Sequence, residues 1–439
     1  MAESALVTDL YQLTMLDAYR RLGLGGRAVF ELYARRLPPE RGYLLVAGLE
    51  PALEYLQGLH LERAELDYLA SLGRFAPDFV DWLAGLRFTG DVHAVPEGTV
   101  LFADEPWLRV TAPIAEAQFV ESRLINLLHY STLIASKAAR CVLVAGGRPL
   151  VDFGMRRAHG AEAACLAARA AAIAGFAGTA TVEAGRRYGL PLVGTMAHSF
   201  IQAHDEERAA FEGFARCHPE HVTLLIDTYD TLAAAHQVVA LRRQGVPVDA
   251  VRIDSGDLGS LAREVRTILD AGGCGDVRVL VSGNLDEYQI AALVGGGAPI
   301  DAFAVGTRLG TSNDAPSIDC AYKLEEYDGE PRRKRAWGKE TWPGRKQVYR
   351  RFGADGLMAG DAVALEGEPA AGEPLLRPVM AGGRRLAAAE PLERVRERAA
   401  RSLAALPAGA RRLVEPVPVP VEISSGIRAL AAAADAARG

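Results

Sequence analysis

Short apolar runs recur through the middle of the chain, and each is followed by a polar or glycine-rich turn and then a helical segment. The runs are centred near residues 151, 192, 224, 251, 279 and 304. Because a β/α unit occupies roughly 30 residues, this spacing predicts a serial β/α array with a parallel sheet. Six evenly spaced units favour a (β/α) barrel, and an open, doubly wound sheet is the competing interpretation.

The segments before this array have the pattern of a mixed α+β region. Apolar positions over residues 8–21 share one helix face, which Thr8 or Asp9 would cap. The segment AVFELYARRL is typical of a strand, and residues 92–114 contain short β-type runs interrupted by Pro and Gly. A long helix fits residues 115–139.

The alanine-rich run at residues 161–182 carries Glu162 and Arg169, so we expect a packed helix rather than a membrane span. After residue 326 the chain has basic stretches, short strand-like pieces, a helical segment over 391–406 and the extended segment VEPVPVPVEI. We expect three regions, which are an N-terminal α+β domain (1–112), a barrel with the active site (113–325) and a C-terminal segment that packs on the N-terminal domain (326–439).

Composition limits the classes of function. The chain has 439 residues, with 49 Lys and Arg against 55 Asp and Glu, so its formal net charge is −6. No global basic field exists to hold nucleic acid or an anionic membrane, so a bound anion must be held by a local site. The N-terminus shows no signal-peptide pattern. The five cysteines are far apart and form no CxxC pair, which argues against disulfides and a zinc site and predicts a cytoplasmic location.

Polar residues gather just after each predicted strand. In a barrel the carboxyl ends of the strands carry the active site. Six polar strand ends in register are hard to explain as ordinary loops. In chain order they are DFGMR, TMAHS, DTYD, DSGD, SGN and GTR.

Two of these strand ends, on neighbouring strands, suit a phosphate group. Gly306-Thr307 begins a turn with two glycines and two hydroxyl residues, and Ser282-Gly283-Asn284 follows the preceding strand. Exposed backbone N–H groups in such turns bind phosphate without net charge, and the last strands of a barrel are its usual place. An ordinary glycine turn is the alternative interpretation.

The segment VRIDSGD places Arg252 and Asp254 on one face of a strand, because side chains alternate along a strand. A guanidinium beside a carboxylate suits a ribose phosphate, since the carboxylate accepts from hydroxyls and the guanidinium binds phosphate. Asp254 or Asp257 could also hold Mg²⁺ through its waters. A buried Arg–Asp pair inside the barrel is the alternative.

His198 lies just past a predicted strand, in GTMAHSF. A histidine there can be a base, a metal ligand, a nucleophile toward phosphorus or a structural residue. No second histidine lies at ligand spacing, which argues against a metal site. Phe153 interrupts a polar strand end, so we expect it to face the site, where Phe153 with Arg156 and Arg157 would suit a flat anionic ring.

Taken together and in order, six segments resemble the nicotinate phosphoribosyltransferase family. They are TDLYQLTM, FELYARRLPPERGYLLVAGL, VDFGMRRAHG, GTMAHSF, RIDSGDL and GTRLGTSND, and the likeness extends over essentially the whole chain. The resemblance implies an α/β fold in which an irregular (β/α) barrel of the type II phosphoribosyltransferase kind joins an α+β domain built from both chain ends.

The resemblance also implies an activity. Such an enzyme forms nicotinate mononucleotide and pyrophosphate from nicotinate and 5-phosphoribosyl 1-pyrophosphate, as part of NAD salvage. Family members couple this ligase-type pentosyl transfer to ATP hydrolysis through a phosphohistidine. They need Mg²⁺ and are usually homodimers with shared active sites.

By the same resemblance, His198 is the residue that is phosphorylated, and Arg252 and Asp254 hold the ribose and its neighbours. Phe153 and Tyr11 would enclose the pyridine ring, with Tyr11 from the other subunit. The other implied substrate contacts are Arg156 or Arg157 at the nicotinate carboxylate, Thr179 and Ala180, and Ser282, Gly283, Asn284, Gly306 and Thr307 at the 5′-phosphate. Lys339 and Lys346 either reach pyrophosphate from a mobile loop or belong to a solvated basic strand.

Several alternative functions remain. A nicotinamide phosphoribosyltransferase would offer an aspartate to the carboxamide where GTATVEAG has Ala180, which favours the acid as substrate. A quinolinate phosphoribosyltransferase would be shorter and have no use for GTMAHSF. A non-catalytic nucleotide-binding barrel that regulates a partner need not keep His198, Asp254 and the aromatic pair together. A barrel aldolase or isomerase would need a lysine or a Glu/His base at a strand end, where only His198 qualifies.

Overall fold

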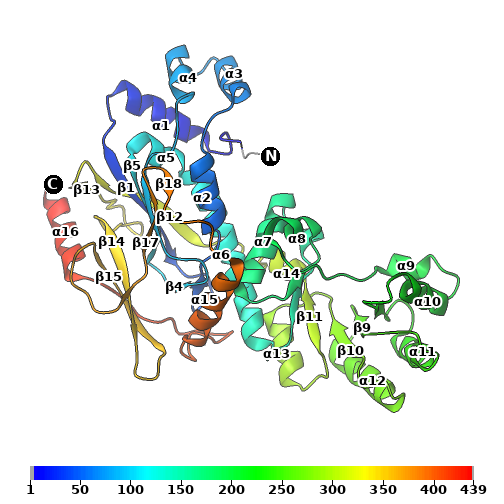
Figure 1. Cartoon of the computed structure of the whole chain (residues 1–439). Helices are drawn as coiled ribbons and strands as arrows, with labels where there is room; N and C mark the ends of the chain where they lie inside the picture. Colours follow the sequence, from blue (N-terminus) through cyan, green and yellow to red (C-terminus); the bar gives the residue numbers. More distant parts are fainter. Residues whose placement is uncertain (1–3, 438–439) are drawn as a thin grey trace. The chain divides into compact units, whose positions relative to one another are not determined.

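Segments from both ends of the chain form one unit of the protein, and the middle of the chain forms a second unit (Figure 1). The computed structural model describes residues 4–437. The chain passes from the first unit to the second after Ser136 and returns after Pro316. Both points differ from the boundaries expected at 112 and 325, because the first part of helix α6 (Glu121–Val144) and all of strand β12 (Asp319–Tyr327) belong to the first unit.

The first unit is built around a seven-stranded antiparallel sheet, in which β1 is an interior strand paired with β12 on one side and β5 on the other. Seven consecutive residues of β1 are buried, so both faces of this strand are covered. The strands in spatial order are β13 (Glu330–Pro331), β12, β1 (Arg27–Arg36), β5 (Pro106–Pro113), β3 (Asp91–Ala94), β17 (Arg377–Ala381) and β18 (Arg384–Arg385).

Within residues 4–437, two smaller sheets, seven whole helices and the first part of α6 complete the first unit. The extended segment VEPVPVPVEI, for which the sequence left an edge segment or a linker open, ends in β19 at the edge of the four-stranded sheet. The smaller sheets are β16 (Glu373–Pro374), β14 (Lys346–Phe352), β15 (Met358–Leu365) and β19 (Val421–Ile423), and β2 (Leu44–Leu45) with β4 (Val100–Leu101). The helices are α1 (Leu10–Arg21), α2 (Leu49–Gly58), α3 (Arg63–Ser71), α4 (Pro77–Leu83), α5 (Ile114–Phe119), α15 (Leu392–Ala404) and α16 (Ser425–Ala436).

A buried ion pair joins the two larger sheets of the first unit. Lys346, the first residue of β14, places its ammonium 2.8 Å from a carboxylate oxygen of Glu31 on β1. Their side chains are 4% and 0% exposed. The expectation that Lys346 could reach a pyrophosphate from a mobile loop is therefore wrong, whereas Lys339 is exposed.

The second unit contains a six-stranded parallel sheet with helices after the strands. Its strands are β6 (Leu150–Asp152), β7 (Gly178–Thr179), β8 (Thr223–Leu225), β9 (Ala250–Ile253), β10 (Arg278–Val281) and β11 (Ala302–Val305). Its helices are the 3₁₀ turn η1 (Met155–Arg157), α7 (Ala161–Ala174), α8 (Val182–Tyr188), α9 (His198–Gln202), α10 (Glu207–Cys217), α11 (Thr231–Arg243), α12 (Leu258–Ala271), α13 (Glu287–Gly295) and α14 (Thr307–Gly310).

The strand order of this sheet decides between a barrel and a doubly wound sheet. The order is β7–β6–β11–β10–β9–β8, so the first strand, β6, pairs with the last strand, β11, as a ring requires. Leu192 adds one parallel bridge beyond β7. Within residues 4–437 no ladder joins that segment to β8. The expected irregular barrel is confirmed, and its sheet is open between Leu192 and β8.

Three local expectations need correction. The helix predicted over residues 115–139 is two helices, α5 and α6, with Val120 between them. The alanine-rich run is helical only to Ala174, and strand β7 follows within it. The strand predicted near residue 192 is reduced to one bridge, because Pro191 has no N–H to donate to a ladder.

No helix among residues 4–437 is long and apolar enough to cross a bilayer. None of the five cysteines forms a disulfide.

Candidate active site

The parallel strands of the second unit bring their polar ends to one edge of the sheet. Asp152 at the end of β6 lies opposite Val305 of β11 on one side and Thr179 of β7 on the other. Val281 of β10 lies opposite Ile253 of β9. The ends of these strands are therefore in register, so the residues that follow them lie along one edge of the sheet, as the sequence pattern predicted.

Asp152 fixes the ends of β6 and β7 to each other. Its carboxylate accepts hydrogen bonds from the Thr179 hydroxyl at 2.7 Å and from the Gly154 N–H at 2.8 Å. Burial raises the pKa of Asp152, and these two hydrogen bonds act in the opposite direction. Thr179, which we expected to contact substrate, thus has its hydroxyl engaged within the protein, while the next residue, Ala180, is exposed.

Arg252 lies at the centre of the polar edge. Its guanidinium donates to the Thr195 hydroxyl at 2.8 Å and to the Met196 carbonyl at 3.2 Å, and it lies 3.7 Å from the Asp254 carboxylate. The same guanidinium stands 5.7 Å from the centre of the Phe153 ring. Burial lowers the pKa of Arg252, and the carboxylates of Asp254 and Asp227 oppose that effect. The expected proximity of Arg252, Asp254 and Phe153 is therefore present.

His198 is the first residue of α9, and two residues that follow β8 orient its ring. Its Nδ1 lies 3.1 Å from the Thr228 hydroxyl, and its Nε2 lies 4.0 Å from Oδ1 of Asp227. The His198 side chain is 38% exposed, whereas that of Asp227 is 2% exposed. The ring is thus held on one side and open to a ligand on the other.

Asp227 is the residue that the sequence analysis did not select. Its Oδ2 accepts from the Asp254 N–H at 3.0 Å and from the Ser255 hydroxyl at 2.6 Å. Asp227 therefore links the β8 end, with His198, to the β9 end, with Asp254. The sequence did contain a signal for Asp227. It directly follows an apolar run, as Asp254 does in the next β/α unit.

The turn after β10 packs tightly against the turn after β9. The Ser282 hydroxyl donates a hydrogen bond to the Asp254 carboxylate. Gly283 has φ +98°, and a Cβ there would lie 1.9 Å from the Asp254 carbonyl oxygen. Only glycine fits this position, and the next residue, Asn284, also has a positive φ of 52° and is exposed.

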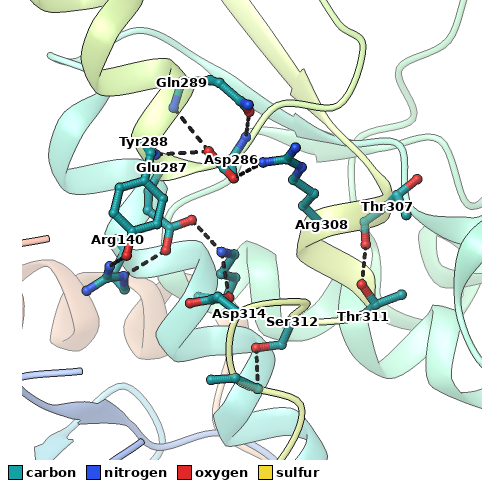
Figure 2. Close-up of polar contacts among 12 residues, drawn as sticks. Arg140, Asp286, Glu287, Tyr288, Gln289, Thr307, Arg308, Thr311, Ser312 and Asp314 are labelled. Atoms are coloured by element: carbon teal, nitrogen blue, oxygen red, sulfur yellow. Dashed lines mark hydrogen bonds and ion pairs between the residues drawn. The ribbon is translucent and has the colours of Figure 1, made fainter. Parts of the chain in front are cut away.

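The turn after β11 begins at Gly306, which precedes the short helix α14. A Cβ at Gly306 would lie 3.0 Å from the Phe153 carbonyl oxygen, so the ends of β11 and β6 are also in close contact. Thr307 is exposed, and Figure 2 shows its carbonyl oxygen accepting from the Thr311 hydroxyl, at 2.8 Å. Arg308, next in the chain, reaches Asp286 at the start of α13.

The other predicted residues lie in various places. Arg156 and Arg157 form the exposed turn η1, and Arg156 is one of the charges that lower the pKa of Arg252. Asp257 is the N-cap of α12, where its carboxylate accepts from two backbone N–H groups at 3.1 Å. Tyr11 belongs to the first unit, where it is 46% exposed and its phenol donates to Glu121 at 3.2 Å.

Within residues 4–437 no group of three or more His, Cys, Asp and Glu side chains has an arrangement that could hold a metal ion by itself. Apart from Asp152, whose carboxylate binds Thr179 and Gly154, the polar edge carries the neighbouring carboxylates of Asp254 and Asp227. Oδ1 of Asp227 is buried and accepts no hydrogen bond. Mg²⁺ commonly binds one or two carboxylates together with substrate phosphates, so these oxygens suit it.

Comparison with protein families covers most of the chain. Three family models match it: the N-terminal domain of nicotinate phosphoribosyltransferase over residues 6–129, the family itself over 149–330 and its C-terminal domain over 368–431. The chain belongs to the nicotinate phosphoribosyltransferase family. The family assignment suggested by the ordered motifs is therefore confirmed.

Relatives in the nicotinate phosphoribosyltransferase family come from several organisms. A nicotinate phosphoribosyltransferase of Mycobacterium tuberculosis is 49% identical over 413 residues, which cover 93% of this chain and 89% of that protein. One from Bacillus subtilis is 41% identical over 376 residues, 83% of this chain and 76% of that protein. The crystal structure of human nicotinic acid phosphoribosyltransferase matches with a TM-score of 0.87 at 29% identity, covering 97% of this chain and 99% of that chain.

Proposed function

We propose that this protein catalyses the transfer of phosphoribose from 5-phosphoribosyl 1-pyrophosphate to nicotinate, which yields nicotinate mononucleotide and pyrophosphate for NAD salvage. One observation carries the proposal. His198, Arg252 and Asp254 meet at the polar edge of the barrel, and Asp227 links them, in a chain of this family.

The chemistry asks for positioning more than for acid–base catalysis. The pyridine nitrogen of nicotinate attacks the anomeric carbon, a C–N bond forms, and the C–O bond to pyrophosphate breaks. The ring nitrogen carries no proton, so no strong base is required. Arg252 and Asp254 would hold the ribosyl group while positive charge develops at the anomeric carbon, and neutralisation of the leaving group would supply the rest.

The nicotinate subsite is proposed beside Phe153. The aromatic ring and the Arg252 guanidinium, 5.7 Å apart, offer a stacking surface and a positive charge to a planar carboxylate. Arg156 and Arg157 are exposed nearby in sequence and are proposed to bind the carboxylate. Tyr11 would close the ring's other face from the partner subunit of a homodimer.

ATP coupling is proposed to run through His198. Transfer of the γ-phosphoryl group to the imidazole would give ADP and a phosphohistidine, whose later hydrolysis releases phosphate. Thr228 and Asp227 support this role because they hold the ring while 38% of the side chain stays exposed. The added negative charge would help to organise the cationic groups around the ribosyl donor.

Mg²⁺ is proposed as the metal of this reaction. Asp254 and Asp227 would hold it together with the pyrophosphate and waters, and it would supply Lewis-acid stabilisation of the leaving group. Asp257 is less suited, because its carboxylate already caps α12. A cytoplasmic location is also proposed, and the five free cysteines accord with it.

One assay tests the proposal. Purified protein, Mg²⁺ and 5-phosphoribosyl 1-pyrophosphate are incubated with nicotinate, nicotinamide or quinolinate, each with and without ATP. We expect mononucleotide from nicotinate, with a higher yield when ATP is present. Preferential use of nicotinamide or quinolinate would show that the protein has the corresponding alternative activity. No product from any substrate would favour the non-catalytic regulator.

A histidine variant tests the coupling. His198→Ala should abolish nicotinate-dependent ATP hydrolysis and leave slow, ATP-independent transfer. His221→Ala is the matched control, because His221 is exposed and lies before β8, at the opposite end of that strand. Unchanged ATP coupling in His198→Ala would overturn the phosphohistidine assignment without affecting the proposed transfer reaction.

A further inference from the structure

Two turns at the polar edge are connected by an ion pair that none of the substrate contacts explains. The first turn, Ser282–Asn284, is followed two residues later by Asp286, which caps α13, and the second, Gly306–Thr307, leads directly into Arg308. The Arg308 guanidinium donates to Oδ2 of Asp286 (Figure 2). The pair therefore spans the distance between the two turns proposed to hold the 5′-phosphate.

Asp286 is itself rigidly held. Its Oδ1 accepts from the backbone N–H groups of Tyr288 and Gln289, each at 3.0 Å, and the Gln289 side chain accepts from the Asp286 N–H in return. This capping box leaves Oδ2 for Arg308, and the Asp286 side chain is 6% exposed. The Arg308 side chain is 34% exposed, so the buried and doubly capped carboxylate of Asp286 is the fixed partner of the pair.

A second connection lies beneath the first. Glu287, which is fully buried, pairs with Lys137 at 2.5 Å and with Arg140 at 2.8 Å, and both cations belong to α6. Lys137 also binds Asp314, beyond α14, at 2.7 Å. The start of α13 and the segment after α14 are thus fixed to the same helix, as Figure 2 shows. Movement of one turn relative to the other would have to break one of these connections.

We propose that Asp286 and Arg308 are positioning residues for the phosphate subsite. They hold the two turns at the separation at which the N–H groups of both point to one phosphomonoester dianion. Because the Arg308 guanidinium is bound to Asp286, the subsite offers backbone N–H groups and the Thr307 hydroxyl rather than a free cation. This inference rests on the proposed function, which supplies the 5′-phosphate as the ligand.

Two variants remove the pair in different ways. Asp286→Asn keeps an oxygen that can cap α13 but loses the charge that pairs with Arg308. Arg308→Met removes the guanidinium and replaces the aliphatic part of the side chain with an unbranched apolar chain. The matched control is Arg242→Met, because the Arg242 side chain has an exposure similar to that of Arg308, 30% against 34%, and pairs with Asp276 in the same unit, at 2.6 Å.

The readout compares two ligands that differ only in the 5′-phosphate, nicotinate mononucleotide and nicotinate riboside. Dissociation constants are measured by calorimetry for the wild type, the two single variants, the double variant and the control. We expect each single substitution to raise the dissociation constant of the mononucleotide about tenfold and that of the riboside less than twofold. The double variant should bind the mononucleotide no more weakly than either single variant, because both substitutions remove the same ion pair.

The outcomes separate the inference from the function it rests on. Equal losses for the two ligands, or unchanged affinities in both single variants, would overturn the positioning role. A thermal unfolding scan identifies a variant that fails to fold, and the other single variant then carries the test. A wild type that does not prefer the mononucleotide to the riboside would overturn the 5′-phosphate subsite of the proposed function itself.

Discussion

At the scale of single residues, the candidate site is organised by side chains that contact residues from two different strand ends. Asp227 shows this most clearly, because one buried carboxylate faces His198 and also holds the backbone and side chain that follow β9. A residue of this kind has no motif of its own. Its importance comes from what it joins.

Specificity for the acid is the prediction that belongs to this scale. Ala180 is exposed at the carboxyl end of β7, where an aspartate would repel the nicotinate carboxylate and accept from a carboxamide. We expect Ala180→Asp to lower the acid-to-amide ratio of kcat/KM by at least about tenfold. Steady-state assays with nicotinate and nicotinamide measure the ratio.

The control for that substitution is Ala177→Asp. Ala177 is also exposed, but it precedes β7 and therefore lies at the opposite end of the same strand. An added carboxylate there should leave the ratio unchanged. If Ala180→Asp behaves like the control, Ala180 does not face the ring substituent.

At the scale of elements, the strands of the barrel are very short, and the turns after them hold the residues proposed to bind substrate. β7 has two residues, and Gly178 in it lies so close to the segment before Leu192 that a Cβ would stand 2.7 Å from the Pro191 carbonyl oxygen. Close approach of turns is equally evident at Gly283 and Gly306. These glycines determine how near the strand ends come to one another.

Gly283 gives a prediction at this scale. Gly283→Ala adds a Cβ that would overlap the Asp254 carbonyl oxygen, in addition to strain at φ +98°. We expect a loss of unfolding free energy of more than about 3 kcal/mol, together with a higher KM for the phosphoribosyl donor. Urea unfolding and steady-state kinetics measure the two effects.

A second glycine separates strain from overlap. Gly245 has a similar φ of +86°, but a Cβ there would meet nothing within 4 Å. Gly245→Ala should therefore cost only about 1–2 kcal/mol and leave the KM unchanged. Equal losses at the two positions would mean that the turn after β10 can move away from Asp254.

At the scale of the whole molecule, the two units use buried charge for different purposes. The second unit places buried charge at the polar edge and between α13 and α6, whereas the first unit buries it between sheets, as in the pair of Lys346 with Glu31. Glu325 lies in the same interior, 3.9 Å from the Lys346 ammonium. Burial raises the pKa of Glu325 to about 8, and Lys346 acts in the opposite direction.

This raised pKa predicts a pH dependence of stability. The folded chain keeps a proton on Glu325 that the unfolded chain releases above its ordinary pKa of 4.5. The favourable contribution is therefore complete below pH 4.5 and is lost as the pH rises to about 8. Over that window Glu325→Gln should gain stability relative to the wild type by roughly 1 kcal/mol per pH unit.

Urea unfolding at several pH values within this window measures the difference. Glu330→Gln is the control, because Glu330 lies in the neighbouring strand β13 and is exposed. Its difference from the wild type should not change with pH. A flat difference curve for Glu325→Gln as well would show that Glu325 is ionised throughout the window.

The sequence alone determined the family, the parallel sheet and the strand ends that carry polar residues. These features are local or periodic, because a strand, its turn and its helix follow one another in the chain. Arg252 and Asp254 could be paired from alternation within one strand, and their 3.7 Å separation agrees with that. Phe153 and His198 were selected from their places just after apolar runs.

Only the tertiary structure decided which strand ends meet. The pairing of β6 with β11, the opening beside β8, and the link from Asp227 to Asp254 join residues that are far apart in the chain. The burial of Lys346 among carboxylates was likewise hidden in a segment that reads as basic and solvated. Such features depend on which surfaces pack together, and packing is a property of the folded chain rather than of any segment in it.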